Sequence, residues 1–153
     1  MAGDLIIQIA DAMVQELNWI QTQTPDAFSR PFNAERLYDY TRDLEDTVTL
    51  RVDVVPETHE DEPLTRQAWR GPAIVSIAVR EKFNVNDTAR ADALTLFTGE
   101  LRDFWTTPPR ALMYMPAAKI LKRKIVYPYL QKQFRTHGQF VSVLQLTFNL
   151  VSQ

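Results

Sequence analysis

Few side chains in this chain of 153 residues could do chemistry, and they are widely spread. The two histidines, His59 and His137, are far apart, and the absence of cysteine excludes thiolate metal sites and disulfides. Residues 57–62 carry four carboxylates beside His59 and could in principle gather around a cation. The plainer interpretation is a solvated acidic loop, because runs of charge usually stay in water.

Motifs for covalent or phosphate chemistry are also missing from the sequence. The glycines are Gly3, Gly71, Gly99 and Gly138. Neither a G-x-S-x-G elbow nor a phosphate-binding glycine loop can be built from these positions. Nothing in the sequence around the carboxylates of Asp43, Glu45 and Asp46 indicates a raised pKa, which favours a solvated turn. We therefore expect no enzymatic activity, no metal and no cofactor.

A single basic patch has aromatic residues nearby. It consists of Lys119, Lys122, Arg123 and Lys124, followed by Tyr127 and Tyr129. Lysine and arginine contacts to phosphate supply most non-specific nucleic-acid affinity, and aromatic rings can stack on bases. A formal charge of −2 for the whole chain is poor for a dedicated nucleic-acid binder, however. A solvated or protein-contacting face is the favoured interpretation.

The most informative feature is how charge divides along the chain. Residues 1–103 hold ten basic and nineteen acidic residues, a formal charge of −9, whereas residues 104–153 hold seven basic residues and no acidic one. If exposed, two such regions attract each other between copies and favour head-to-tail association. Trp69 lies between Arg66 and Arg70, and tryptophan and arginine are enriched at interface hot spots. Packing of Trp69 inside its own domain is the alternative.

Hydrophobic periodicity predicts the elements of the first half. Apolar residues recur at intervals of three and four over residues 4–22, which predicts an amphipathic helix. Residues 32–40 are predicted as an edge strand, and strict alternation over residues 47–54 predicts a strand with its aliphatic residues on one face. Pro56 is expected to end that strand, and an acidic loop (residues 56–71) follows.

Alternation resumes over residues 72–83, and this strand is expected to pair antiparallel with the strand at residues 47–54. A second amphipathic helix is expected after a cap at Asn86 or Asp87. Gly99 within that helix costs roughly 1 kcal/mol relative to alanine, which raises the possibility of a close backbone contact there.

The last third contains a basic segment (residues 110–138) in which only residues 120–126 are predicted as a strand. Residues 144–150 alternate clearly and predict a final strand in the same sheet, with one face buried and one wet. The fold class predicted for residues 1–153, taken as one domain, is α+β: a two-layer domain with a mostly antiparallel sheet of four to five strands, covered by two amphipathic helices. No signal peptide or membrane-spanning segment is expected.

The chain resembles a family of tailed-phage tail terminator, or tail-completion, proteins. The residues that carry the resemblance are Ala10-Asp11-Ala12 and Leu17, Phe28-Ser29, Pro31-Phe32, Ala34-Glu35-Arg36, Asp43-Leu44, Leu50-Arg51-Val52, Val54-Val55-Pro56, and Phe140-Val141-Ser142-Val143-Leu144 with Thr147. These are similarities of spacing that span most of the chain. Residues 106–139 depart from the pattern, since this segment is longer and more basic than we expect of the family.

The resemblance implies a small α/β virion protein that forms a homohexameric ring on the head-proximal end of the tail tube. Such a ring ends tube polymerisation, joins the tail to the head connector or stopper protein, and lets genomic DNA pass through its lumen. The family has no known catalytic residues. A neck or head-tail connector adaptor that contacts portal or DNA is the alternative function.

Contacts between subunits or with the tube follow as a hypothesis. The basic residues Lys119, Lys122, Arg123, Lys124 and Arg135 of one subunit would meet the acidic region at residues 39–62 of its neighbour. The residues assigned to these contacts on the acidic side are Glu57, Glu60, Asp61, Glu62, Arg66, Trp69 and Arg70. In an alternative arrangement, the carboxylates of residues 57–62 line the lumen and repel DNA phosphates.

Overall fold

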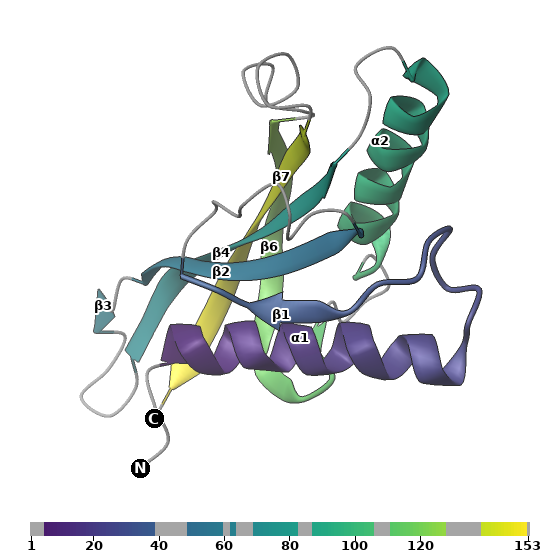
Figure 1. Ribbon diagram of the computed structural model, residues 1–153. Helices are drawn as coiled ribbons and strands as arrows, with labels where there is room; N and C mark the ends of the chain where they lie inside the picture. Colours follow the sequence, from purple (N-terminus) through teal and green to yellow (C-terminus); the bar gives the residue numbers. More distant parts are fainter. Residues whose placement is uncertain are drawn as a thin grey trace.

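A computed structural model of the chain describes residues 5–38, 49–59, 62–63, 69–82, 87–105, 111–127 and 139–152 (Figure 1). Two helices and a twisted sheet make up the described residues, so the predicted α+β class is confirmed. The elements are α1 (Leu5–Gln23), β1 (Ala34–Arg36), β2 (Arg51–His59), β3 (Glu62–Pro63), β4 (Trp69–Lys82), α2 (Thr88–Asp103), β5 (Ala111–Leu112), β6 (Met115–Tyr127) and β7 (Gln139–Ser152).

The described strands form one seven-stranded sheet, more than the four to five strands predicted. The strand order is β1-β2-β4-β7-β6-β5, and β3 pairs with β4 outside this path. Neighbouring strands are antiparallel except for β1 and β2, which are parallel. Register shifts in β2 and twice in β6 mark bulges, which increase twist. Strand directions accordingly turn from β2 to β6 across the sheet (Figure 1).

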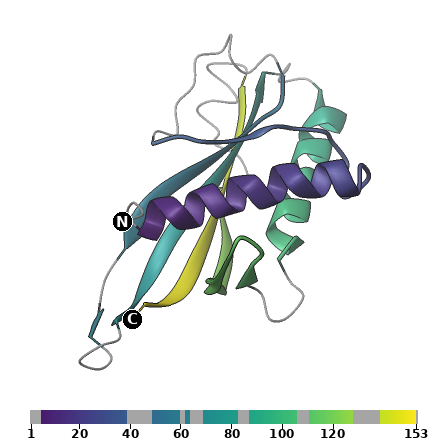
Figure 2. The same ribbon diagram turned by 90° about the horizontal axis from the view of Figure 1, so that it is seen from below.

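Helix α1 confirms the predicted amphipathic helix and lies across one face of the sheet (Figures 1 and 2). Its apolar stripe, which includes Ile9, Met13 and Leu17, is fully buried. On its other side the Asn18 amide accepts a hydrogen bond from the Ala34 amide N–H (2.8 Å) and donates one to the Ala34 carbonyl (3.1 Å). These two hydrogen bonds from the Asn18 side chain to the Ala34 backbone hold the short strand β1 beside α1. The predicted edge strand is therefore present but shorter than expected.

The strands around the acidic loop differ from the prediction at their ends. Pro56 does not end β2, which continues to His59, and β4 begins at Trp69. Among the described residues, β1 pairs with β2 only at residues 52–54, so Pro56 has no strand partner on that edge and its missing N–H costs no ladder bond there. The predicted antiparallel pairing of these two long strands is confirmed.

Helix α2 begins after Asp87, whose carboxylate accepts a hydrogen bond from the Arg90 amide N–H (3.0 Å), so the predicted cap is confirmed. Gly99 does not make the close contact that its position suggested. A Cβ built there would meet only the Arg102 side chain, at 3.8 Å. An aromatic cluster joins α2 to the segment between α1 and β1; its rings belong to Phe28, Phe32, Phe97, Phe104 and Trp105.

The last two long strands exceed their predicted lengths. Strand β6 runs through Pro116, which precedes the first pairing with β7 at Ala118, and β7 covers fourteen residues. Every residue of β7 has a partner in β4. The strand predicted last in the sequence is therefore an inner strand, between β4 and β6.

Both helices contribute to one apolar core on one side of the sheet, here called the helix face. The opposite side, the far face, was expected to be wet, and this expectation is wrong for its centre. Ser76, Ala78 and Arg80 point to the far face and are fully buried, and Val141 and Val143 are nearly so. The far face opens to solvent on β6. In the described part of the chain, neither helix combines the length and apolarity that a bilayer crossing requires.

Candidate functional site

Three lysines of β6 form a row on the far face of the sheet. Lys119, Lys122 and Lys124 stand opposite Asn149, Thr147 and Gln145 of β7, respectively. Residues three apart on a strand normally face opposite ways, but the bulge between Ile120 and Lys122 adds a residue, Leu121, and restores Lys122 to the face of Lys119. All three lysines are exposed. We call them the lysine row.

The lysine row has no ion-pair partner among the residues that the structure describes. Its neighbours on β7 are amides and a hydroxyl, which leave the charge uncompensated. Among the described residues, β5 pairs with β6 only at Met115 and Lys119, so the edge of β6 beside the row has no further strand partner there. Leu121 lies at this edge and is 58% exposed. In the described part of the chain, positive charge and a strand edge without a partner therefore lie together.

Arg123, which the sequence grouped with these lysines, lies on the other side of the sheet. It stands opposite Leu146, a core residue of the helix face. Its Nη1 donates a hydrogen bond to the Arg102 carbonyl at the end of α2 (2.8 Å) and lies 3.7 Å from the Asp103 carboxylate. Hydrogen bonding from Arg102, and then the charges of Arg102 and Arg123, lower the pKa of Asp103. Arg123 thus anchors α2.

Glu57 is the only residue assigned to the acidic side whose side chain is described. Its Oε2 accepts hydrogen bonds from the Ser76 hydroxyl (2.5 Å) and from the Gln145 amide (3.0 Å). Gln145 is also the register partner of Lys124. A polar band therefore crosses the far face from Glu57 to the lysine row, within one subunit.

The remaining assigned residues are described only in part. Backbone pairing places Glu62 of β3 opposite Arg70 of β4, and Pro63 opposite Trp69. The two sides of the acidic loop therefore meet in space at these residues. Two strands, β4 and β7, separate β2 from β6. The other assigned or considered residues lie outside the described residues: Glu60, Asp61, Arg66, Arg135, Asp43, Glu45 and Asp46.

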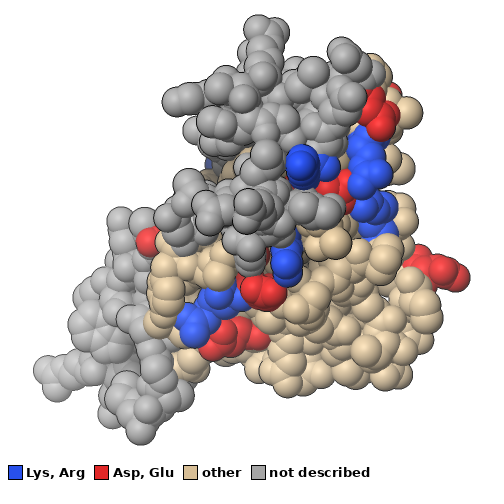
Figure 3. Space-filling view, in the orientation of Figure 1, with Lys and Arg blue, Asp and Glu red and all other residues tan. Residues whose placement is uncertain are grey.

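Charges on the helix face are arranged differently, because acidic and basic side chains lie next to one another there (Figure 3). Arg36 Nε donates to the Asp11 carboxylate (2.7 Å), for example. Hydrogen bonding from Arg36 to the Tyr38 hydroxyl is the main cause that raises the arginine's pKa. Arg30, Arg36 and Arg90 on this face are thus each paired with a carboxylate of their own subunit.

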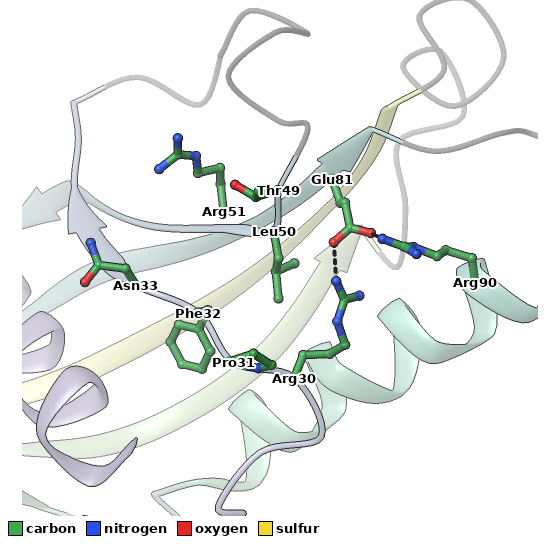
Figure 4. A pocket seen from close by; sticks show the side chains of 9 residues that line it. All are labelled: Arg30, Pro31, Phe32, Asn33, Thr49, Leu50, Arg51, Glu81 and Arg90. Carbon is green, nitrogen blue, oxygen red and sulfur yellow. Dashed lines mark hydrogen bonds and ion pairs between the residues drawn. The ribbon is translucent and has the colours of Figure 1, made fainter. Parts of the chain in front are cut away.

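A pocket of about 560 Å³ opens between the α1–β1 connection, the start of β2, the end of β4 and the start of α2 (Figure 4). At its centre Glu81, fully buried, binds two arginines that approach from different sides. Arg30 Nη2 donates to Glu81 Oε2 (2.5 Å), and Arg90 Nη2 donates to Oε1. We call these three residues the Glu81 cluster. The pocket is also lined by Pro31, Phe32, Asn33, Thr49, Leu50 and Arg51.

One residue of this pocket, Glu81, could have been recognised from the alternation of the sequence. Glu81 continues the alternation of Ile77 and Val79, so it points to the same buried face as these aliphatic residues. A carboxylate in phase with core residues requires cationic partners, since an unpaired buried charge is costly. Which arginines supply them depends on the tertiary fold.

A second buried ion pair lies on the far face. Arg80 Nη2 and Asp53 Oδ2 are 3.7 Å apart, and both side chains are almost completely buried. This pair belongs to the structural core of the sheet, because neither side chain reaches solvent.

Among the described residues, no group of histidine, aspartate and glutamate side chains is arranged to hold a metal ion. Neither a scan against protein-family models nor a search of curated proteins finds a match to this chain.

Proposed function

We propose that this protein is a virion structural protein of the tail terminator type. It forms a ring at the head-proximal end of a phage tail tube, stops polymerisation of the tube and joins the tail to the head connector. It acts through shape and oligomerisation, without catalysis. The proposal combines the resemblance of the sequence to tail terminators with the distribution of charge on the sheet.

The observation that carries the proposal is that opposite charges belong to different parts of one sheet. The lysine row stands on β6, while the acidic run at residues 57–62 includes the end of β2 and strand β3. Strands β4 and β7 lie between β2 and β6. A subunit with complementary patches at two separate places can bind a copy of itself head to tail, and such a heterologous contact closes into a ring when the rotation permits.

In the proposed interface, the lysine row of one copy contacts the acidic run of the next. The lysines have no partner within the described residues, so association gives them the carboxylates they lack. Glu60, Asp61 and Glu62 are the acidic residues we assign to this contact. Glu57 is excluded from a main role because it is bonded to Ser76 and Gln145 of its own subunit.

Charge reversal tests the interface. We expect Lys122→Glu to convert rings into monomers in light scattering. Lys82→Glu is the matched control, since Lys82 is another exposed lysine but pairs with Gln139, six residues from Gln145 along β7. If both variants keep the ring, or if both lose it, the proposed contact is wrong.

Complementary variants make the test sharper. One protein carries Lys119→Glu, Lys122→Glu and Lys124→Glu, and the other carries Glu60→Lys, Asp61→Lys and Glu62→Lys. Each alone should stay monomeric, because like charges then meet at the contact. When mixed, the two should assemble in alternation, with one native and one charge-swapped interface. Failure of the mixture to assemble would contradict the assigned pairing.

A neck adaptor that contacts DNA is the second candidate, favoured by the lysines beside Asn149, Thr147 and Gln145 on an exposed part of the sheet. Lysines contact phosphates, and amides and hydroxyls can add hydrogen bonds. Three phosphate contacts predict a slope of about −3 in a plot of log K against log salt concentration for duplex DNA. A terminator should instead bind the end of a polymerised tail tube and show no such DNA binding.

A further inference from the structure

We propose that the pocket at the Glu81 cluster binds a carboxylate attached to an apolar body. This site is separate from the lysine row, and no part of the proposed function uses it. The inference rests on the charge count, on the unused donors of the two arginines, and on the apolar lining beside them.

Among the described residues, the charge count in the cluster leaves one positive charge in excess. Arg30 and Arg90 bring two positive charges to a single carboxylate, that of Glu81. Arg51, also in the lining, lies 3.5 Å from Glu35 and points away from the cluster (Figure 4). One carboxylate balances the excess, whereas a phosphate dianion would overcompensate it. The charge therefore selects a monoanion.

The two arginines keep donors for such a ligand. Each hydrogen bond to Glu81 uses an Nη2 atom, and a guanidinium has five N–H groups arranged as a planar fork that matches a carboxylate. The side chains of Arg30 and Arg90 are 27% and 43% exposed, so their remaining edges can be reached from the pocket. Glu81 holds them in place from beneath, since its own side chain is fully buried.

The rest of the lining fits an apolar body. Pro31, Phe32 and Leu50 form the wall next to Arg30, and Asn33 and Thr49 supply neutral hydrogen-bonding groups. The volume of about 560 Å³ lies within the range usual for small-molecule sites. The carboxylate can come from a free organic acid or from an acidic side chain on a second copy of this chain.

The first experiment measures the unfolding temperature of the full chain with 4-phenylbutyrate and, in parallel, with the neutral 4-phenylbutyramide. The acid should raise the unfolding temperature and the amide should not. Glu81→Gln removes the carboxylate that occupies one donor group of each arginine. The fold should lose stability, but the acid should bind about tenfold more tightly because the freed donors form charge-assisted hydrogen bonds with it. If Glu81 were only a structural partner, this variant would be destabilised without gaining affinity.

Arg90→Gln should abolish the response to the acid, and Arg102→Gln is its matched control. Both arginines belong to α2, both are 43% exposed, and both pair with a carboxylate, but Arg102 does not line the pocket. If Arg90→Gln fails to fold, the comparison of the acid with the amide on the wild-type chain still shows whether the protein binds a carboxylate.

A second arm distinguishes the source of the carboxylate. If the free acid has no effect but Arg90→Gln weakens self-association in sedimentation while Arg102→Gln does not, the carboxylate belongs to a second copy. If neither the free acid nor Arg90→Gln has an effect beyond its control, the pocket binds no carboxylate and the proposal is overturned. Lys122→Glu, by contrast, tests the lysine row alone, so the two proposals can fail separately.

Discussion

The lysine row and the Glu81 cluster both contain basic side chains, but these side chains differ in exposure and in pairing. In the Glu81 cluster two arginines converge on a buried carboxylate, whereas the lysines of β6 are exposed and have no ionic partner among the described residues. Buried and paired charges help to determine how the subunit folds, and removing one of them lowers the free energy of unfolding. Exposed and unpaired charges add little stability within the subunit, so they remain free to attract another molecule.

This contrast predicts that stability and assembly respond to different substitutions. Changes at buried pairs should lower the free energy of unfolding, and changes in the lysine row should alter association while leaving the free energy of unfolding nearly constant.

The largest effect is expected at the buried pair on the far face. Asp53→Asn leaves the Arg80 guanidinium without its carboxylate in a site where neither side chain reaches solvent. Breaking a buried pair by removing one partner costs about 3–5 kcal/mol. Urea unfolding followed by circular dichroism should show this loss. A loss below about 1 kcal/mol would contradict a stabilising role of this pair in the core of the sheet.

A somewhat smaller effect is expected at Glu16, a buried carboxylate of α1. It accepts hydrogen bonds from the Trp105 indole N–H and from the Met113 amide N–H, both at 2.7 Å. Glu16→Ala leaves the buried Trp105 N–H and the partly exposed Met113 N–H without their acceptor. The loss should be about 2–4 kcal/mol, since a buried unsatisfied group costs about 1–3 kcal/mol and Met113 can bond to water instead. Trp105 fluorescence during unfolding measures the change. An unshifted midpoint would contradict the role of Glu16 as an anchor.

Arg123 and Lys122 provide the most direct comparison, since they are adjacent in sequence and point to opposite faces. Arg123→Gln removes the hydrogen bond to the Arg102 carbonyl and should cost about 1 kcal/mol. Lys122→Gln should change stability by less than about 0.5 kcal/mol, as exposed substitutions usually do. A loss for Lys122→Gln that equals or exceeds the loss for Arg123→Gln would contradict this assignment of the two residues to their faces.

The smallest effect concerns pH and the anchor of α2. The lowered pKa of Asp103 means that its interactions with Arg102 and Arg123 stabilise the fold above the ordinary value of 3.8 and are lost as pH falls through the folded pKa. The carboxylate side chain is 56% exposed, so the contribution should stay below about 0.5 kcal/mol. Asp103→Asn should flatten the stability profile below pH 4 relative to wild type, and a steeper profile would contradict this assignment.

Much of the architecture could be predicted from periodicity. The spacing in α1 and the alternation in β4 and β7 reflect burial on one side, which is a local property of the sequence. Pro56 was misleading because its effect depends on pairing. Among the described residues, β1 pairs with β2 only at residues 52–54, and the sequence does not indicate that this edge of β2 lacks a partner beside Pro56.

The candidate sites were less predictable, for the same reason. The bulge at Leu121 decides that Lys119 and Lys122 share a face and that Arg123 does not, and no residue type signals it. Glu81 was visible as a carboxylate in phase with aliphatic residues, but its partners, Arg30 and Arg90, come from separate segments. Only the tertiary fold brings them together.

The central claim is that the lysine row is a contact between copies of the chain. Its most direct test is the mass of the purified protein in solution, measured for wild type, Lys122→Glu and Lys82→Glu under identical conditions. We expect six times the subunit mass of 17.7 kDa for wild type and Lys82→Glu, and a monomer for Lys122→Glu. A wild-type monomer at concentrations where it joins tail tubes, or an intact ring in Lys122→Glu, would contradict the claim.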